Sequence, residues 1–169
     1  MDTLEALRTR RSIRNYKVKD VEADLIQEIL ATGMSAPSAG NEQPWHFIVL
    51  TERRILEEIP RISPYAAMAR DAPVAILICG DLRLERFEGF WVQDCAAATQ
   101  NMLLAAHALG LGAVWTGIYP MQDRVAGFRE LLDIPDTVVP FALIPLGYPA
   151  HEPRKEDRFK KERIHYNTW

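Results

Sequence analysis

Two short stretches of the sequence carry side chains suited to holding a small charged molecule. The first is the run RRSIR at residues 10–14, which places three guanidinium groups and a hydroxyl within five residues. Arg presents a planar fork of N–H donors that suits a phosphate and other electron-rich oxygens. The second is APSAGNEQPW at residues 36–45, a turn-rich segment of small and amide side chains that ends in a large aromatic. Because such a segment suits the edge of a flat heterocycle, the two runs together predict a phosphorylated planar cofactor.

The composition is typical of a globular chain with one domain. The chain has 169 residues, of which 48% are hydrophobic and 25% are charged, and this length suits a single domain over residues 1–169. A formal net charge of −3 supplies no positive field that would draw the protein to nucleic acid or to an anionic membrane. The first residues are acidic and amphipathic, so no signal peptide is evident. We therefore expect a cytoplasmic protein without a nucleic-acid or membrane partner.

The first half of the chain predicts short helices and short strands. Asp2 is placed to cap a helix over residues 2–10. Asp20 is expected to cap a second helix, whose apolar residues recur at helical spacing: Leu25, Ile26, Ile29 and Leu30. Three further elements follow: a strand at 47–50, a helix at 54–59 bounded by Pro60, and a strand at 74–78 opened by Pro73.

Residues 90–109 form the longest expected helix and the most apolar one. Its polar side chains Gln93, Gln100 and His107 recur every seven residues, with Asp94 and Asn101 beside them, and form one narrow stripe. A helix that is apolar nearly all round is buried, so it should lie at the centre of the fold or against a partner chain. Gly110 ends it. The remaining expected elements are a strand at 113–116 stopped by Gly117, a helix that Asp123 caps and that runs to Leu132, and a strand at 138–146.

The sequence lacks the familiar motifs of nucleophilic or metal-dependent catalysis. Its four histidines are scattered singly, no metal-ligand cluster is evident, and no glycine-rich phosphate loop follows a strand. Cys79 and Cys95 lie in apolar stretches without a C-x-x-C spacing and are expected to be buried thiols. Trp115 and Tyr119 are expected in the core rather than against a substrate. Any chemistry must therefore be brought in by a cofactor.

The composition changes from residue 150 onward. Arg and Lys become frequent, and apolar residues are few until residues 164–166. Such a tail cannot form a core of its own, so it either stays mobile or wraps onto another body.

Four elements, in this order, resemble the nitroreductase family of FMN-dependent oxidoreductases. They are the run at 10–14, APS…NEQPWHF at 36–47, LGLGAVWTG at 109–117, and LGYP at 146–149 followed by the basic tail that ends in RIHY. Taken alone, each could be a solvated charge cluster or an ordinary loop. Their shared order covers nearly the whole chain. The chain is a short member, without the insertion that many members carry between the second strand and the long central helix.

The resemblance implies an α+β fold of the nitroreductase type. That fold has a central mixed, mainly antiparallel sheet flanked by helices, a long buried central helix, and a C-terminal tail that wraps the partner subunit. It also implies a homodimer that holds one FMN at each of two interface sites.

The resemblance further implies which residues hold the flavin. Arg10 and Ser12 would contact its phosphate and ribityl side, and Arg14 would approach the pyrimidine end of the ring. Backbone N–H groups of Thr116 and Gly117 would lie near the flavin N5. Residues of the other chain would approach the same ring, and the basic tail would reach the phosphate. The full expected set is Arg10, Arg11, Ser12, Arg14, Pro37, Ser38, Asn41, Thr116, Gly117, Arg158 and Lys160, with Lys155 as a further neighbour; Pro37, Ser38 and Asn41 come from the other chain.

The implied activity is an FMN-dependent oxidoreductase. NADH or NADPH would give a hydride to the flavin N5, and a nitroaromatic, quinone or related small molecule would then take the electrons at the same place, in a ping-pong sequence. No protein side chain would act as nucleophile or general base, and no metal would be required. The alternative is a flavin-binding carrier or sensor without reductase turnover.

Overall fold

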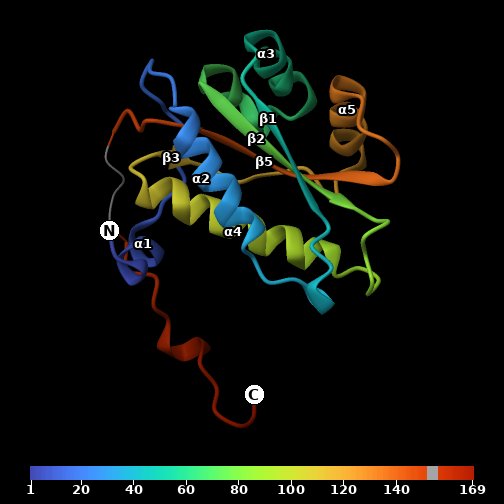
Figure 1. Ribbon diagram of the computed structural model, residues 1–169. Helices are drawn as coiled ribbons and strands as arrows, with labels where there is room; N and C mark the ends of the chain where they lie inside the picture. The colour runs from blue at the N-terminus through green and yellow to red at the C-terminus, as the bar shows by residue number, and fades with distance from the viewer. Residues whose placement is uncertain (152–155) are drawn as a thin grey trace.

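The structure, a computed structural model, describes residues 1–151 and 156–169, and its centre is an antiparallel sheet between two layers of helices (Figure 1). The strands are ordered β1-β2-β5-β3, and β4 also pairs with β5. Every pair of named strands among the described residues is antiparallel, and a single parallel bridge joins Ser12 to Ala113. The strands are β1 (Trp45–Leu50), β2 (Val74–Asp81), β3 (Gly112–Ala113), β4 (Thr116–Gly117) and β5 (Val138–Gly147).

Helices cover both faces of the sheet. On one face α4 packs directly on β2 and β5 while α2 lies along α4, and on the other face lie α3 and α5 (Figure 1). This cover explains why β2 and β5 are buried at every position, since a strand with two covered faces needs a nearly continuous apolar run. The α-helices are α1 (Thr3–Thr9), α2 (Ala23–Met34), α3 (Arg53–Ile62), α4 (Trp91–Ala108) and α5 (Gln122–Leu132). Short 3₁₀ turns occupy Ala39–Asn41, Pro64–Asp71 and Lys161–Arg163.

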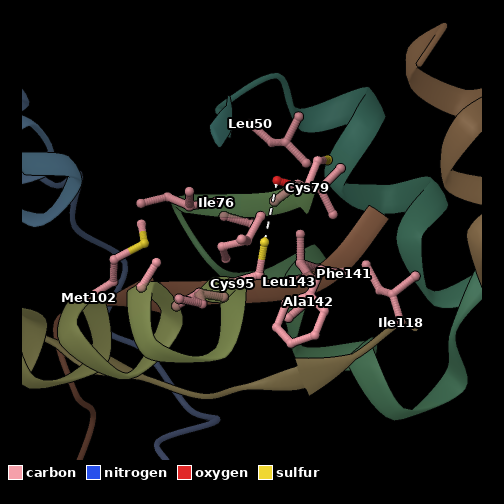
Figure 2. Close-up of a cluster of buried hydrophobic side chains, with 14 of the residues drawn as sticks. Leu50, Ile76, Cys79, Cys95, Met102, Ile118, Phe141, Ala142 and Leu143 are labelled. Carbon is pink, nitrogen blue, oxygen red and sulfur yellow. Dashed lines mark hydrogen bonds between the residues drawn. The ribbon is translucent and has the colours of Figure 1, made fainter. Parts of the chain in front are cut away.

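The core lies between α4 and the two central strands, as Figure 2 shows. Cys95 on α4 faces Cys79 on β2, and its Sγ lies 3.8 Å from the Cys79 carbonyl oxygen. Both cysteines are free and fully buried, which confirms the expected buried thiols. Burial raises the pKa of Cys79 to about 12 and raises that of Cys95 further. Both thiols therefore stay protonated and serve as small apolar side chains.

Three predicted helix boundaries are wrong, for local reasons. Helix α2 begins at Ala23 with Glu22 rather than Asp20 at its N-cap, and the Glu22 carboxylate is held by the Tyr148 hydroxyl and Lys19 instead of capping a helix N–H. Asp123 lies inside the first turn of α5, not at its cap. Pro60 lies within α3, which continues to Ile62 because Ile62 packs closely against Gly127 of α5. By contrast, Asp2 caps α1 as predicted, accepting the N–H groups of Leu4 and Glu5.

The strand predicted at 113–116 is split into β3 and β4. Ala113 pairs with Leu146 and Thr116 pairs with Leu143, so Val114 lies opposite Pro145 of β5. Val114 N–H donates to the Pro145 carbonyl at 3.3 Å, but proline has no N–H to return a second bond. The ladder is therefore interrupted at this point, and Gly117 is the last residue of β4.

Candidate functional site

The N-terminal arginine run and the C-terminal tail meet at one cleft. Arg10 and Arg11 follow the last residue of α1, and Arg11 Nη2 donates to the Glu156 carbonyl oxygen at 2.9 Å. The cleft has a volume of about 430 Å³ and is lined by α1, the arginine run and the first described residues of the tail: Leu7, Arg8, Arg10, Arg11, Glu156, Asp157, Arg158 and Phe159. Residues from the two ends of the sequence are thus brought together around one concave surface.

The cleft concentrates positive charge. Burial lowers the pKa of Arg10, and the nearby guanidinium groups of Arg158 and Arg11 lower it further. Within the described part of the chain, the buried Nε of Arg11 has no hydrogen-bond partner. Arg158 is held by the exposed Glu156 carboxylate, with Nη2 and Nε at 2.9 and 3.1 Å from Oε2. An anion bound here would reduce the repulsion between the guanidinium groups and would accept a hydrogen bond from the Arg11 Nε.

Ser12 and Arg14 extend the run along the edge of the sheet. Ile13 N–H donates to the Ala113 carbonyl at 2.9 Å, and the Ile13 side chain packs on Gly112 so tightly that a Cβ there would lie 2.5 Å from it. Both Ser12 and Arg14 are exposed, while Ile13 is partly buried between them. The apolar residue therefore anchors the run and leaves its polar neighbours open to a ligand.

Thr116 and Gly117 differ in what they leave available. The Thr116 side chain is buried and its Oγ1 donates to the Leu143 carbonyl at 2.9 Å, so the fold already uses its hydroxyl. Gly117 is exposed, and a Cβ there would meet no atom within 4 Å. Its carbonyl accepts a hydrogen bond from Arg124 Nη1 at 2.9 Å. The backbone at Gly117 is therefore fixed in place and open on one side.

The aromatic residues near Gly117 correct one expectation. Trp115 is 36% exposed and meets Phe141 edge-to-face with ring centroids 5.7 Å apart, so it lies at the surface rather than in the core. Its two-residue segment between β3 and β4 turns it outward. Tyr119 is partly buried and packs on the buried Trp91 at 4.8 Å, in agreement with the expected core position.

The segment that carries Pro37, Ser38 and Asn41 lies elsewhere. Ala39 N–H donates to Asp94 Oδ1 at 2.9 Å, so this segment sits at the first turns of α4. Ser38 Oγ accepts from the Gln43 N–H, and Asn41 Oδ1 accepts from the Gln43 amide. The backbone is left-handed at Gly40, Asn41 and Gln43, with φ of 52°, 57° and 46°. These bonds hold the segment in a tight turn.

The two groups of predicted site residues lie at opposite ends of α4 in one chain. Thr9 Oγ1 meets His107 Nε2 at 2.8 Å near the last turn of α4, next to the arginine cleft, whereas Ala39 meets Asp94 near the first turns. At 1.5 Å per residue these two contacts are about 20 Å apart along the helix. Figure 1 shows α1 at one end of α4 and the turn after α2 at the other. One chain therefore does not bring Pro37, Ser38 and Asn41 to the arginine cleft.

The remaining tail residues occupy different surroundings. Lys160 is exposed just before the turn at Lys161–Arg163 and does not line the cleft. Lys155 lies outside the described residues. From residue 156 onward every residue of the chain is exposed, and the tail (red in Figure 1) passes α1 and then runs away from the sheet.

Three acidic residues near the two ends of α4 were not predicted as functional. Glu42 and Asp94 are buried beside the segment 37–41, and Glu156 neutralises Arg158. For Glu42 and Asp94 the available sequence signal was an acid inside an otherwise apolar or amide-rich segment, whereas Glu156 lies in the charged tail and carried no such signal. Among residues 1–151 and 156–169 no group of three or more His, Cys, Asp or Glu could hold a metal ion. In the same residues no helix has the length and hydropathy needed to cross a membrane.

Comparisons with known proteins identify the family. The model of the nitroreductase family matches residues 7–148. A Methanothermobacter thermautotrophicus protein named as an NADH dehydrogenase/NAD(P)H nitroreductase is 58% identical over 169 residues, which cover 100% of this chain and 88% of that protein. A solved structure under the same name from Parabacteroides distasonis is 40% identical, with a TM-score of 0.95 over 99% of this chain and 98% of that one. A Desulfovibrio desulfuricans nitroreductase solved in complex with FMN is 34% identical, with a TM-score of 0.85 over 98% and 96% of the two chains.

These matches confirm the α+β fold and the family expected from the sequence. The helix α4 and the mainly antiparallel sheet are those that the resemblance implied. With its fold, its cationic cleft and relatives named as nitroreductases all in agreement, the chain belongs to the nitroreductase family of oxidoreductases.

Proposed function

We propose that this protein is an FMN-dependent oxidoreductase that uses NADH or NADPH to reduce small acceptors such as nitroaromatics and quinones. The observation that carries the proposal is the cleft where Arg10, Arg11 and Arg158 converge. Support comes from the family match and from a relative whose solved structure is described as a complex with FMN. A guanidinium cluster of this kind fits the mononucleotide's phosphate, which carries close to two negative charges near pH 7.

The residues present fit that phosphate in number and in placement. Arg10 is partly buried, so its charge is less screened by water than that of a fully exposed arginine. The Arg11 Nε, which has no acceptor among the residues that the structure describes, would gain one. Exposed Ser12 adds a neutral donor beside them. Burial and then repulsion from Arg158 and Arg11 lower the pKa of Arg10, and an anion held here would offset that repulsion.

The other residues of the site would orient the ring and influence its redox balance. Bound FMN would supply the electron chemistry by taking a hydride from NAD(P)H and passing electrons to the acceptor, with donor and acceptor using the site in turn. Arg14 would favour the reduced ring by placing a positive charge where negative charge develops. Gly117, fixed through Arg124, would offer main chain to the ring without a side chain in the way.

We also propose that two chains complete each site. A flavin held at the arginine cleft cannot reach Pro37, Ser38 and Asn41 of the same chain, because the length of α4 separates them. A second copy with its α4 reversed would bring its own segment 37–41 to the first copy's cleft. Exposed apolar side chains on α1 and the tail support such an interface: Leu4, Leu7, Phe159, Ile164, Tyr166 and Trp169.

The experiment that tests the proposal uses the purified protein. We expect a yellow protein whose released ligand has the mass of FMN and which oxidises NADH or NADPH only when an acceptor is supplied. Initial rates against donor and acceptor should give parallel double-reciprocal lines, the pattern of a ping-pong sequence. A colourless protein that takes up no added FMN would contradict the proposal. Bound flavin that stays oxidised for minutes with NAD(P)H would instead identify a carrier without turnover.

A further inference from the structure

Two buried carboxyl groups meet beside the segment 37–41. Glu42 is 6% exposed and Asp94 is 4% exposed. Asp94 Oδ1 accepts the Ala39 N–H at 2.9 Å, and Glu42 Oε2 accepts the N–H groups of Arg86 and Phe87 at 2.6 and 3.3 Å. Each acid therefore uses one oxygen to hold the backbone of a different segment.

The second oxygen of each acid is buried without a donor. Glu42 Oε1 and Asp94 Oδ2 have no hydrogen-bond partner elsewhere in the described part of the chain, although the two side chains face one another. An ionised carboxylate offers only acceptors, so two of them cannot satisfy each other. One proton between the two oxygens would satisfy both at once.

We propose that Asp94 and Glu42 share one proton, with Asp94 as the donor, and that this proton positions the segment 37–41. The link to flavin binding rests on the proposed function, because that segment is the part expected to reach the partner's flavin. Asp94 and Glu42 would be positioning residues, since neither lies at the arginine cleft.

The charges around the pair agree with this arrangement. Burial raises the pKa of Asp94 to about 6, and Glu42 and the nearby Glu85 contribute to that rise. Burial also opposes ionisation of Glu42, but the N–H groups of Arg86 and Phe87 together with the facing Asp94 carboxyl outweigh it and leave the pKa of Glu42 below its ordinary value. The adjacent Cys95 thiol stays neutral, since its own pKa is raised. The proton therefore belongs to Asp94 and the negative charge to Glu42.

The pair connects three parts of the chain. Besides its N–H bond to Glu42, Arg86 donates from Nη1 to the Gly40 carbonyl at 3.2 Å, and the Phe87 ring packs so closely on Gly40 that a Cβ there would lie 2.6 Å from it. Loss of the shared proton would leave two negative charges in a buried space, with Glu85 close by. Their repulsion would separate Glu42 from α4 and loosen the turn at 39–41.

The sign of the pH effect follows from the pKa of Asp94. Its value of about 6 lies above the ordinary 3.8, so the folded protein keeps a proton that the unfolded chain has released. Stability from this group is therefore fully present below about pH 4 and falls between about pH 4 and pH 6. Above pH 6 the group contributes no further change.

Amide substitutions test the shared proton directly. In Asp94→Asn the amide oxygen can still accept from Ala39 while the amide nitrogen donates to Glu42 Oε1. In Glu42→Gln the amide oxygen can accept from Arg86 while its nitrogen donates to Asp94 Oδ2. In the double variant two NH₂ groups face each other and neither finds an acceptor. We therefore expect each single variant to keep nearly the wild-type stability and the double variant to be clearly less stable.

The first measurement is the thermal unfolding midpoint from pH 4.5 to pH 8. The wild-type midpoint should fall as the pH rises toward 6, because the folded protein then loses the stabilisation that the Asp94 proton provides. In D94N and E42Q this contribution to the pH dependence of the midpoint should be absent. At pH 5 each single variant should unfold near the wild-type temperature, while D94N/E42Q should lose more than the two single losses combined. A D94N midpoint that falls as steeply as the wild type, or a double-variant loss that equals the sum, would overturn the shared proton.

The second measurement is the dissociation constant of added FMN over the same pH range. The ratio of wild-type to D94N values cancels titration of the FMN phosphate itself, whose second pKa is about 6. Above pH 6 the ratio should rise with pH, by at most about tenfold per pH unit. A flat ratio, with the thermal result as expected, would overturn the positioning role. If no variant or wild type binds FMN, the proposed function fails, and the thermal comparison still decides the shared proton.

Discussion

The two ends of α4 hold charged residues in opposite ways. At the end near His107, arginines line an open cleft and repel one another, and the Arg11 Nε has no partner among residues 1–151 and 156–169. At the end near Asp94, acids are buried and bonded to backbone N–H groups of neighbouring segments. An added anion would bind favourably at the first end, whereas at the second end the charged groups already stabilise the local backbone. Ligand affinity should therefore depend on the first end and local conformation on the second.

The largest effect is expected from removing the tail. A chain that ends at Asp157 loses Arg158 and the exposed aromatic residues beyond it, while the sheet does not use residues 158–169 in the described part of the chain. We expect a folded monomer whose affinity for FMN falls more than about a hundredfold, since a charged contact and the partner's segment 37–41 are both lost. Sedimentation measures the oligomeric state, circular dichroism measures folding, and flavin titration measures the affinity for FMN. A truncated chain that still dimerises and retains FMN would show that the tail belongs to neither interface nor site.

Replacing Arg10 breaks the cationic end alone. Arg10→Ala should weaken FMN binding more than tenfold, given roughly 1.5–3 kcal/mol for a hydrogen bond to a charged group. Arg54→Ala is the matched control, because Arg54 is exposed and pairs only with Glu52 among the described residues. Fluorescence titration of the flavin measures both. Equal affinities in the two variants would remove Arg10 from the phosphate site.

Asp81 provides a comparison for Asp94. Both acids are buried, but Asp81 is paired with a cation, Arg83, whereas Asp94 faces another acid, Glu42. The Arg83 guanidinium lowers the pKa of Asp81 to about 2, against an ordinary 3.8, and burial opposes this only in part. A lowered acid pKa contributes stability above about pH 4 that is lost as the pH falls toward 2. Asp81→Asn should therefore cost at most about 2 kcal/mol of unfolding free energy at pH 7, since one pKa unit is worth about 1.4 kcal/mol and water screens the exposed Arg83 guanidinium.

Chemical denaturation of wild type and D81N between pH 2.5 and pH 7 checks this prediction. The difference between them should shrink toward low pH, which is the reverse of the slope expected from Asp94. A difference that is constant over this range would mean that the carboxylate of Asp81 is not what stabilises the turn after β2.

The smallest effect concerns the acid within the cationic cleft. Glu156→Gln should tighten FMN binding by about twofold, because the pair with Arg158 is exposed and such pairs are weak. Glu162→Gln, an exposed tail residue outside the cleft, is the control. The gain should disappear at high salt, where surface charges are screened. Weaker binding by E156Q would indicate that Glu156 orders Arg158 for the ligand rather than competing with it.

The sequence predicted those features that depend on local pattern or on a shared order of motifs. Apolar runs located β2 and β5, the apolar helix over residues 90–109 became α4, and the arginine run located one wall of the cleft. Helix caps were less predictable, because a cap depends on tertiary contacts where the chain enters the helix. The Glu22 carboxylate, for example, accepts a hydrogen bond from Tyr148, 126 residues away, and does not cap α2. The split at Val114 required knowing that Pro145 lies opposite. The pairing of Glu42 with Asp94 is likewise a tertiary contact that neither local sequence contains.

His107, which meets Thr9 next to the arginine cleft, links the filling of the cleft to proton uptake through the charges of Arg10 and Arg11. Burial lowers the pKa of His107, and the charges of Arg10 and Arg11 lower it further. An anion seated among those arginines cancels part of their field, so the imidazole should gain basicity when the cleft fills. In the pH range where this imidazole titrates, ligand binding should then be accompanied by uptake of a fraction of a proton from the buffer. In an NMR pH titration, the ring signals of His107 would therefore report whether an anion occupies the cleft, even when that anion is colourless.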